Sequence, residues 1–507
     1  MQFEPSAAIA YWAKYAAAKS AVIHADQAWT YKTLNDHISR LASSVQLLPP
    51  EHRRIAVACG NDLSLLTSIL AVVRAGRSAV IIPRNLEPEP LAYCLANAAV
   101  LAAIADSRSD STTSLQTVMG PEGIVIDYAT DDITNTPSPP TTGSLPADSE
   151  WAVFYSSGTT GLPKGIVRDH YSVVVELLGW CLELGLNQNH TFLVGRPVYY
   201  TGGLLIALSA LLMGSTLVLE PSLTWSTYQD VLREQHIHFT FLIPSQLRQF
   251  VLEAKECQPS ILSADTILLL GEPISGDEKL EARSVLRSAI VESWGNSESL
   301  GTITRPEDLD CAPDSIGRPF LTDEMYIVSE NGEPLPPGEV GYIAGSQDAA
   351  FSEYCANPEA TGQALRNNMV VSEDLGYVDD SGLFYIEGRK NEVREIDGQH
   401  LSLVHLENRI RRDGLVRDIC IACLPDPTGA AELGAAVVPL EPNNVSPDTA
   451  AILHSIVSHL PRGTHVKTLV TLPSLPKTPT GKVIRHAVLD ILAPPNAHPT
   501  SKPELDS

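Results

Sequence analysis

The sequence predicts an α/β fold with two or more domains, and two observations support that prediction. Short apolar segments alternate with longer segments in which apolar residues recur every three or four positions, which is the pattern of strands separated by helices. The chain has 507 residues, 44% of them apolar and 19% charged, so it can bury several cores. We therefore expect a large N-terminal domain with two doubly wound sheets and a small β-barrel-like module, followed by a small α+β C-terminal domain.

Residues 1 to about 130 form the first alternating segment. The expected helices are 32–47, 64–75 and 90–98, and the expected strands are 54–58, 78–83 and 100–105. Strands separated by helices imply a parallel sheet covered on both faces. The segment 130–150 that follows is rich in Pro, Thr, Ser and Asp, which cannot fill a core, so we expect a surface linker there.

A second alternating segment runs from residue 151 to about 291. Its expected strands are 152–155, 191–196, 216–220, 239–243 and 266–270. The longest apolar stretch, 204–219, is interrupted by small polar residues and is too short for a bilayer span. We interpret it as a core helix that turns into a buried strand.

Shorter spacing and frequent Gly-Pro turns in residues 316–346 predict the small β-rich module. From residue 389 a compact segment follows, with expected helices 403–411 and 449–459 and expected strands 419–424 and 434–439. The expected domains are therefore 1–388 and 389–492. The last residues, 493–507, are expected to be a disordered tail.

Composition excludes several classes of partner. Thirty-five basic residues against 60 acidic residues give a net charge of -25, which repels phosphate backbones and anionic lipids, so we expect neither a nucleic acid nor a membrane partner. The first twenty residues lack a basic patch followed by an apolar run, so no secretory signal is expected and the cytoplasm is the expected location.

Eight cysteines are scattered without a regular framework, which favours reduced thiols over a disulfide scaffold. Cys420 and Cys423 form a single CxxC pattern within an apolar run. We interpret them as buried strand residues, with redox or metal chemistry as the alternative.

The strongest local signal is the loop of residues 155–165, which reads YSSGTTGLPKG and follows an apolar strand. Small residues allow backbone amides to close around phosphate oxygens, hydroxyls add donors, and Lys164 adds positive charge. The loop is not a Walker P-loop, because that motif has Gly directly before Lys and begins a helix there, whereas Pro163 stands at that position.

With this loop, five further motifs resemble the adenylate-forming (AMP-binding) superfamily, which includes acyl-CoA synthetases, stand-alone peptide-synthetase adenylation domains and luciferases. The resemblance covers nearly the whole chain. After an opening match at WTYKTLNDHISRLASSV, the motifs are GEP at 271–273, WGNSE at 294–298, EDLG at 373–376, GRKN at 388–391 and PKTPTGK at 476–482.

The resemblance implies binding of ATP and Mg²⁺. The residues expected at the nucleotide are Ser156, Ser157, Gly158, Thr159, Thr160, Lys164, Gly271, Glu272, Pro273, Trp294, Gly295, Asn296, Ser297, Asp374 and Arg389. Within this set, Trp294 would face adenine, Asp374 would accept from the ribose hydroxyls, and Glu298 would hold Mg²⁺ as a hard oxygen ligand.

The resemblance also implies a catalytic lysine on a mobile C-terminal domain. Lys482 would bridge the substrate carboxylate and the α-phosphate as negative charge develops, and Arg389 and Glu298 complete the expected catalytic set. Lys390 and Asn391 mark the hinge about which the small domain rotates. Gly398 would approach the incoming thiol.

Three positions depart from the usual family pattern. The hinge position has Asn391 instead of Asp or Lys, the ribose motif reads Ser372-Glu373-Asp374 instead of Thr-Gly-Asp, and Ser297 replaces Thr before the magnesium glutamate. None of these changes removes a group that adenylation requires.

The expected acyl pocket lies near Tyr199, Tyr200, Gly202, Gly203 and Gly301. For the two tyrosines, a role in packing alone is an equal alternative. In family members that load α-amino acids, an Asp at the position of Tyr200 pairs with the substrate ammonium. An α-amino acid would bury an unpaired ammonium here, so we expect an acid without an α-amine, apolar or aromatic.

The expected acceptor is coenzyme A. Because no carrier domain follows residue 490, the alternatives are a separate carrier protein or an amine that forms an amide. A third possibility from another class is a catalytically silent nucleotide-binding regulator. The joint presence of Lys164, Glu298, Asp374, Arg389 and Lys482 argues against it. Oxidation of the adenylate, as in luciferases, is a further alternative.

Overall fold

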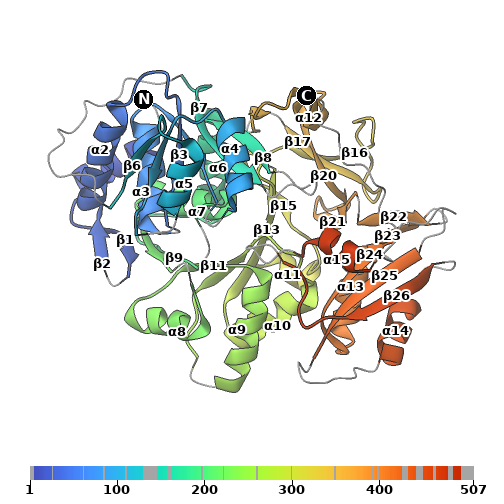
Figure 1. Cartoon of the computed structure of the whole chain (residues 1–507). Helices are drawn as coiled ribbons and strands as arrows, with labels where there is room; N and C mark the ends of the chain where they lie inside the picture. The colour runs from blue at the N-terminus through green and yellow to red at the C-terminus, as the bar shows by residue number, and fades with distance from the viewer. Residues whose placement is uncertain are drawn as a thin grey trace, which may run out of the picture. The chain divides into compact units, whose positions relative to one another are not determined.

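A computed structural model, shown in Figure 1, describes most of the chain. The described residues are 5–25, 27–60, 62–83, 86–108, 111–129, 146–156, 163–195, 198–220, 222–257, 261–298, 300–346, 350–390, 392–396, 399–424, 432–440, 449–460, 464–477 and 483–492. Most of the predicted linker and the whole predicted tail lie outside these ranges.

The chain divides into two compact units. The first comprises Met1–Leu270, Gly276–Ser372 and Val378–Tyr385, and the second comprises Gly271–Ser275, Glu373–Tyr377 and Ile386–Ser507. The predicted domain boundary at residue 388 stays a prediction.

The first unit contains a seven-stranded sheet. Its strand order is β18 (Glu353–Tyr354), β8 (Lys164–Asp169), β7 (Glu150–Ser156), β4 (Ser78–Ile81), β3 (Arg54–Ala58), β5 (Ala102–Ala105) and β6 (Ile124–Asp127). Strands β7 to β6 are parallel to their neighbours, whereas β8 and β18 are antiparallel additions. Helices α3 (Leu63–Arg74), α4 (Pro88–Asn97) and α5 (Ser111–Met119) connect these strands. This is the first predicted parallel sheet.

The first unit also contains a nine-stranded sheet. Its order is β15 (Arg318–Pro319), β14 (Gly301–Ile303), β13 (Ala289–Gly295), β12 (Thr266–Leu269), β11 (Phe239–Leu242), β9 (Thr191–Val194), β10 (Thr216–Leu219), β1 (Ser20–His24) and β2 (Gln27–Thr30). The pairs from β1 to β13 are parallel, and both edges carry antiparallel strands. Its helices are α1 (Pro5–Tyr15), α2 (Tyr31–Gln46), α6 (His170–Glu183), α7 (Thr201–Leu212), α8 (Trp225–Glu234), α9 (Pro244–Cys257), α10 (Gly276–Leu286) and α11 (Asp308–Cys311).

Strands β1 and β2 correct the assignment of residues 1–130 to the first sheet alone. These strands come from the first alternating segment but join the second sheet through β10. The physical reason is burial: Ala21 and Val22 are fully buried, and the Tyr31 hydroxyl donates to the Ser215 carbonyl at 2.7 Å.

Residues 204–219 form the predicted helix and buried strand. Helix α7 is buried along nearly its whole length, Gly214 adopts a φ of 77° at the turn, and β10 follows. Across the described residues, no helix has both the length and the apolar character that crossing a bilayer requires.

The predicted β-rich module is present as a five-stranded sheet. Four strands follow the order β16 (Met325–Val328), β17 (Gly341–Ser346), β20 (Met369–Val378) and β19 (Leu365–Arg366), and β21 (Phe384–Arg389) pairs with β20. Helix α12 (Pro358–Ala364) precedes β19.

The second unit is the predicted α+β unit. A hairpin of β22 (Val393–Ile396) and β23 (Gln399–Ser402) precedes a three-stranded sheet of β24 (Val416–Cys423), β25 (Glu432–Pro439) and β26 (His465–Thr471). Helices α13 (Leu403–Arg412), α14 (Thr449–Ser458) and α15 (Arg485–Leu492) pack on it in two separate apolar clusters. Cys420 and Cys423 both lie in β24, as the strand interpretation predicted. Cys420 is buried as expected, whereas Cys423, the last residue of the strand, is only half-buried.

Candidate active site

The phosphate-loop candidate is the connection of the β7–β8 hairpin. Ser156 pairs with Lys164 across the two antiparallel strands, so both residues stand at the base of the loop. Lys164 begins a strand instead of a helix, which agrees with the exclusion of a Walker P-loop. The predicted phosphate ligands Ser157, Gly158, Thr159 and Thr160 lie outside the described residues.

Buried groups from elsewhere in the chain support the base of this hairpin. The Tyr155 hydroxyl donates to the Cys94 carbonyl at 2.8 Å and to Asn97 Oδ1 at 3.0 Å, and burial raises the pKa of Tyr155. The Cys355 amide donates to the Gly165 carbonyl at 2.7 Å. A Cβ on Gly165 would lie 3.0 Å from Cys355 Cβ, so the close packing here favours glycine.

The predicted magnesium and α-phosphate residues lie in the turn between β13 and β14. Gly295 pairs with Gly301, and the Asn296 side-chain oxygen accepts from the Leu300 amide at 2.9 Å. The Asn296 amide donates to the Leu300 carbonyl at 3.1 Å. This closed turn places Ser297 and Glu298 at its tip.

Helix α7 contributes a further contact to the β13–β14 turn. Thr201, the first residue of α7, donates through Oγ1 to Ser297 Oγ at 3.2 Å. Thr201 is 9% exposed, so the bond is shielded from most solvent. The start of α7 therefore fixes the orientation of the predicted α-phosphate ligand.

Tyr354 connects the two hairpins. Its hydroxyl donates to Glu298 Oε1 at 2.7 Å, and Lys164 Nζ lies 5.4 Å from the centre of its ring. Strand β18 carries Tyr354 and pairs with β8 at Ile166, and the Phe351 amide donates to the Glu298 carbonyl at 3.1 Å. The phosphate lysine and the magnesium carboxylate predicted from the sequence thus meet at one tyrosine.

Sequence reasoning did not find Tyr354. The contact depends on the pairing of β18 with β8, two strands far apart in the chain, and no local pattern distinguishes this tyrosine from a core aromatic residue.

The predicted acyl-pocket residues gather at the start of α7 and at β14. Tyr199 and Tyr200 are half-buried, and their ring centres lie 4.4 Å apart. A Cβ on Gly202 would approach Leu270 Cδ2 to 2.6 Å, and one on Gly301 would lie 3.4 Å from the Phe320 ring. These glycines therefore allow close packing around the predicted pocket, and Gly203 is buried beside them.

A half-buried carboxyl group, that of Asp323, lies in the connection between β15 and β16. Burial raises the pKa of Asp323 to about 7, the nearby carboxylate of Glu176 adds to the rise, and the Gly301 amide opposes it by hydrogen bonding to the carboxyl. The Asp323 carboxyl group therefore lies near Gly301, one of the predicted pocket residues. It was not among the predicted site residues.

In the second unit, two predicted nucleotide residues lie close together. Arg389 Nε is 3.6 Å from Asp374 Oδ1, and the Lys390 amide donates to the Glu373 carbonyl at 3.0 Å. The Asp374 side chain is 16% exposed. Gly271, Glu272 and Pro273 also belong to this unit, and Gly271 adopts a φ of 103°.

The segment on either side of Lys482 is anchored, although Lys482 itself, Asn391 and Gly398 lie outside the described residues. Lys477 pairs with Val483 in an isolated antiparallel bridge, and the Ile484 amide donates to the Pro476 carbonyl at 2.9 Å. The Lys477 ammonium lies 2.8 Å from Asp418. These contacts close the base of the lysine loop.

A family model described as AMP-binding enzyme matches residues 9–355, which contain both hairpins and Tyr354. The chain belongs to the AMP-binding enzyme family. Feruloyl-CoA synthase from Amycolatopsis is 25% identical to this AMP-binding enzyme over 483 residues, 92% of this chain and 95% of that protein.

One further relative of this AMP-binding enzyme and one solved structure with the same fold have names that state other activities. Fatty acid–[acyl-carrier-protein] ligase from Streptomyces coeruleorubidus is 26% identical over 356 residues, 68% of this chain and 67% of that protein. The amide bond synthetase from Marinactinospora thermotolerans has the same fold, with a TM-score of 0.84, 21% identity, and coverage of 96% of this chain and 100% of that one.

Proposed function

We propose that this AMP-binding enzyme activates a carboxylic acid with ATP and transfers the acyl group to the thiol of coenzyme A. A carboxylate oxygen attacks the α-phosphorus, the bond from that phosphorus to the bridging oxygen breaks, and pyrophosphate leaves. The thiol then attacks the acyl carbon of the adenylate, losing its proton, and AMP leaves. The observation that carries the proposal is the meeting of Lys164 and Glu298 at Tyr354.

Glu298 is suited to hold Mg²⁺ at this place. It is a half-buried carboxylate whose Oε1 is held by Tyr354, and carboxylate oxygen is the donor that this cation prefers. When bound, Mg²⁺ would neutralise charge on the phosphates. Lys164 would add a second positive charge beside the same phosphates, which lowers the repulsion between two anionic reactants.

The remaining roles follow the sequence motifs. Ser156, Ser157, Gly158, Thr159 and Thr160 would donate to the β- and γ-phosphates. Ser297 would contact the α-phosphate, and Trp294, Gly271 and Pro273 would enclose adenine. Asp374 would accept from the ribose hydroxyls.

Lys482 would stabilise the charge that develops between the carboxylate and the α-phosphorus. In this proposal the segment around Arg389, Lys390 and Asn391 is a hinge, and rotation there withdraws Lys482 before thiol transfer. Gly398 would then lie beside the thiol arm.

An aromatic acid without an α-amine is the proposed substrate class. Tyr199 and Tyr200 offer aromatic surface at the predicted pocket, and no carboxylate occupies the stretch RPVYYTGG, where one would pair with an α-ammonium. The similarity to feruloyl-CoA synthase supports the same class.

A carrier protein and an amine are the competing acceptors. The similarity to the carrier-protein ligase supports the first, and that to the amide bond synthetase supports the second. Four relatives that align with 89–94% of this chain are named as CoA synthases or CoA ligases, which favours the thiol of coenzyme A as the acceptor. We propose a cytoplasmic location, in agreement with free cysteines.

The test is pyrophosphate release from MgATP with a panel of aryl, short-chain, medium-chain, β-amino and α-amino acids. The Lys482→Ala variant is the control for adenylation. We expect release with an aryl acid, its loss in the variant, and faster turnover on addition of coenzyme A. Release that coenzyme A does not accelerate would favour a carrier protein or an amine, and no release with any acid would contradict the proposed activity.

A further inference from the structure

Three side chains that the proposed reaction does not use gather at the amino ends of two parallel strands in the first unit. His236 and His238 precede β11, and Asp265 precedes β12. Phe239 and Thr266, the first residues of these strands, are register partners. The cluster thus lies at the sheet edge opposite the carboxyl ends of β12 and β13, which lead to the candidate active site.

Paired backbone holds the cluster in place. The Asp265 amide donates to the Ile237 carbonyl at 3.1 Å, and the Thr266 amide donates to the His238 carbonyl at 2.9 Å. On the other side, the His238 amide donates to the Thr191 carbonyl at 3.0 Å. Because three neighbouring strands position these residues, little ordering is needed before a ligand binds.

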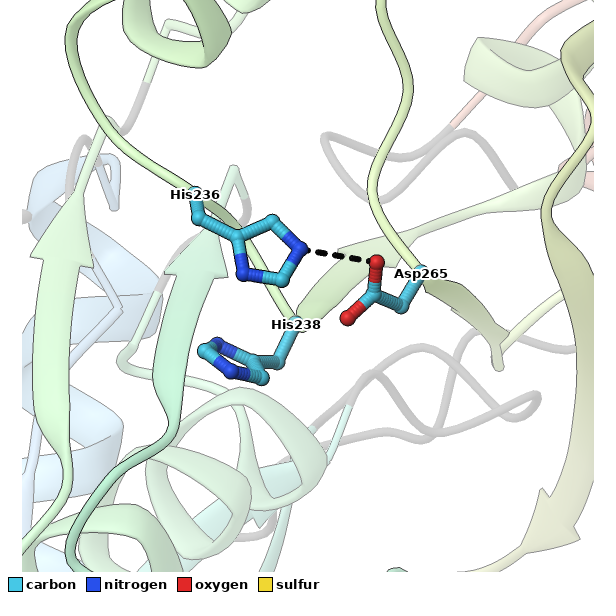
Figure 2. Close-up of side chains that lie close together, drawn as sticks. All are labelled: His236, His238 and Asp265. Carbon is cyan, nitrogen blue, oxygen red and sulfur yellow. Dashed lines mark hydrogen bonds and ion pairs between the residues drawn. The ribbon is translucent and has the colours of Figure 1, made fainter.

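The three side chains lie close together, as Figure 2 shows. His236 Nε2 lies 2.9 Å from Asp265 Oδ1, and the two imidazole rings have centres 4.4 Å apart. One potential ligand atom from each of the three residues lies within 4.8 Å of the others. The side chains of His236 and Asp265 are 63% and 54% exposed, so a cation can reach them from solvent.

We propose that His236, His238 and Asp265 form a binding site for one divalent transition-metal ion, such as Zn²⁺. Two imidazole nitrogens and one carboxylate oxygen are the donor set of borderline cations, whereas Mg²⁺ and Ca²⁺ prefer oxygen alone. Metal–ligand bonds of about 2.0–2.2 Å require ligand atoms about 3–3.5 Å apart, and small rotations of two exposed side chains reach that spacing. Solvent completes the coordination.

One hydrogen bond opposes metal binding at His238. The Thr191 amide donates to His238 Nδ1 at 3.1 Å, so the neutral ring carries its proton on Nε2. A metal at Nε2 requires that proton to move to Nδ1 and the bond to Thr191 to break. The site is therefore weaker than a structural zinc site, whose histidines already have the required tautomer.

The test uses the full chain after removal of metals with a chelator, in the absence of nucleotide. Calorimetric titration with ZnCl₂ is expected to show one saturable site, and His236→Asn and Asp265→Asn are each expected to weaken it by about tenfold or more. His454→Asn is the matched control, because His454 is an exposed histidine on α14 outside the cluster. It should leave binding unchanged.

A second readout identifies the ligands. With CuCl₂ as the probe, electron paramagnetic resonance should show imidazole nitrogen coupling that His236→Asn reduces. No saturable binding, or equal binding by the variants and the parent chain, would overturn the proposal. Pyrophosphate release should be unchanged in both cluster variants, since the site lies away from the candidate active site, so failure here is separable from failure of the proposed function.

Discussion

The β7–β8 hairpin is supported by side chains from other elements, whereas the β13–β14 turn is closed mainly by its own asparagine. Tyr155 and Gly165 in the first hairpin pack against Asn97 and Cys355. In the second, Asn296 bonds to Leu300 in both directions.

The two hairpins therefore differ in what the described residues contribute. Those at the base of the first support the fold, whereas the second turn carries a predicted catalytic group. The described contacts at the base of the first hairpin come from Asn97 and Cys355, which lie outside the loop. The second turn presents a carboxylate whose direction is set by one outside residue, Tyr354. Substitutions in the first hairpin base should therefore act on folding, and those at the second turn should act on catalysis.

The largest expected effect is that of Glu298→Gln on the second turn. The amide keeps the size of the side chain but removes the charge that would hold Mg²⁺, so pyrophosphate release should fall by about 100-fold or more. Melting temperature should be unchanged. Glu353→Gln, at an exposed carboxylate beside Tyr354, is the control, and an equal loss in both variants would refute a specific role for Glu298.

Gly165→Val tests the base of the first hairpin. The added Cβ would lie 3.0 Å from both Asn97 Oδ1 and Cys355 Cβ, so overpacking should lower the free energy of unfolding by about 1–3 kcal/mol. Chemical denaturation measures the change. Gly362→Ala, where a Cβ meets nothing within 4 Å, should not destabilise, and equal stability of both variants would contradict the packing argument.

Tyr354→Phe tests the connection between the hairpins. The ring remains beside Lys164, but Glu298 loses a hydrogen bond to its charged group, which is worth about 1.5–3 kcal/mol. We expect kcat/KM for pyrophosphate release to fall by about tenfold, with a higher Mg²⁺ requirement. Tyr326→Phe removes a similar bond, from a hydroxyl to Glu324 at 2.7 Å, and should leave both quantities unchanged.

The smallest expected effect is that of Thr201→Val. It removes the hydroxyl that donates to Ser297 at 3.2 Å, a neutral bond worth about 1 kcal/mol, so release should slow by about threefold to fivefold. Thr201→Ser keeps a hydroxyl and should restore the rate. A slow serine variant would assign the loss to packing of α7 instead.

Much of the fold could be predicted because the parallel strands are short apolar runs between amphipathic helices. Strand β2 was missed because it is an edge strand whose residues are exposed or only partly buried, so it lacks the apolar signal. Strand β26 was missed for a similar reason, since its residues are half-buried or exposed.

The candidate site likewise has one part that local motifs predict and another part that they do not. Lys164, Ser297 and Glu298 stand in contiguous motifs, and the structure brings their hairpins together. Tyr354, the support from Asn97, and the His236–His238–Asp265 cluster depend on pairing between distant strands, which a single sequence does not encode locally. Lys482 and most phosphate-loop residues stay predictions.

Arg485 affects how sequence variants near the lysine loop should be interpreted. Its guanidinium donates to Glu392 Oε1 at 3.0 Å, to Glu407 Oε1 at 2.5 Å and to the Ile421 carbonyl at 2.5 Å. A lysine has one compact ammonium and cannot span three acceptors with a planar group. Arg485 lies three residues after Lys482. A change from arginine to lysine at this position is therefore expected to disturb the support of the lysine loop and is not a neutral exchange of surface charge.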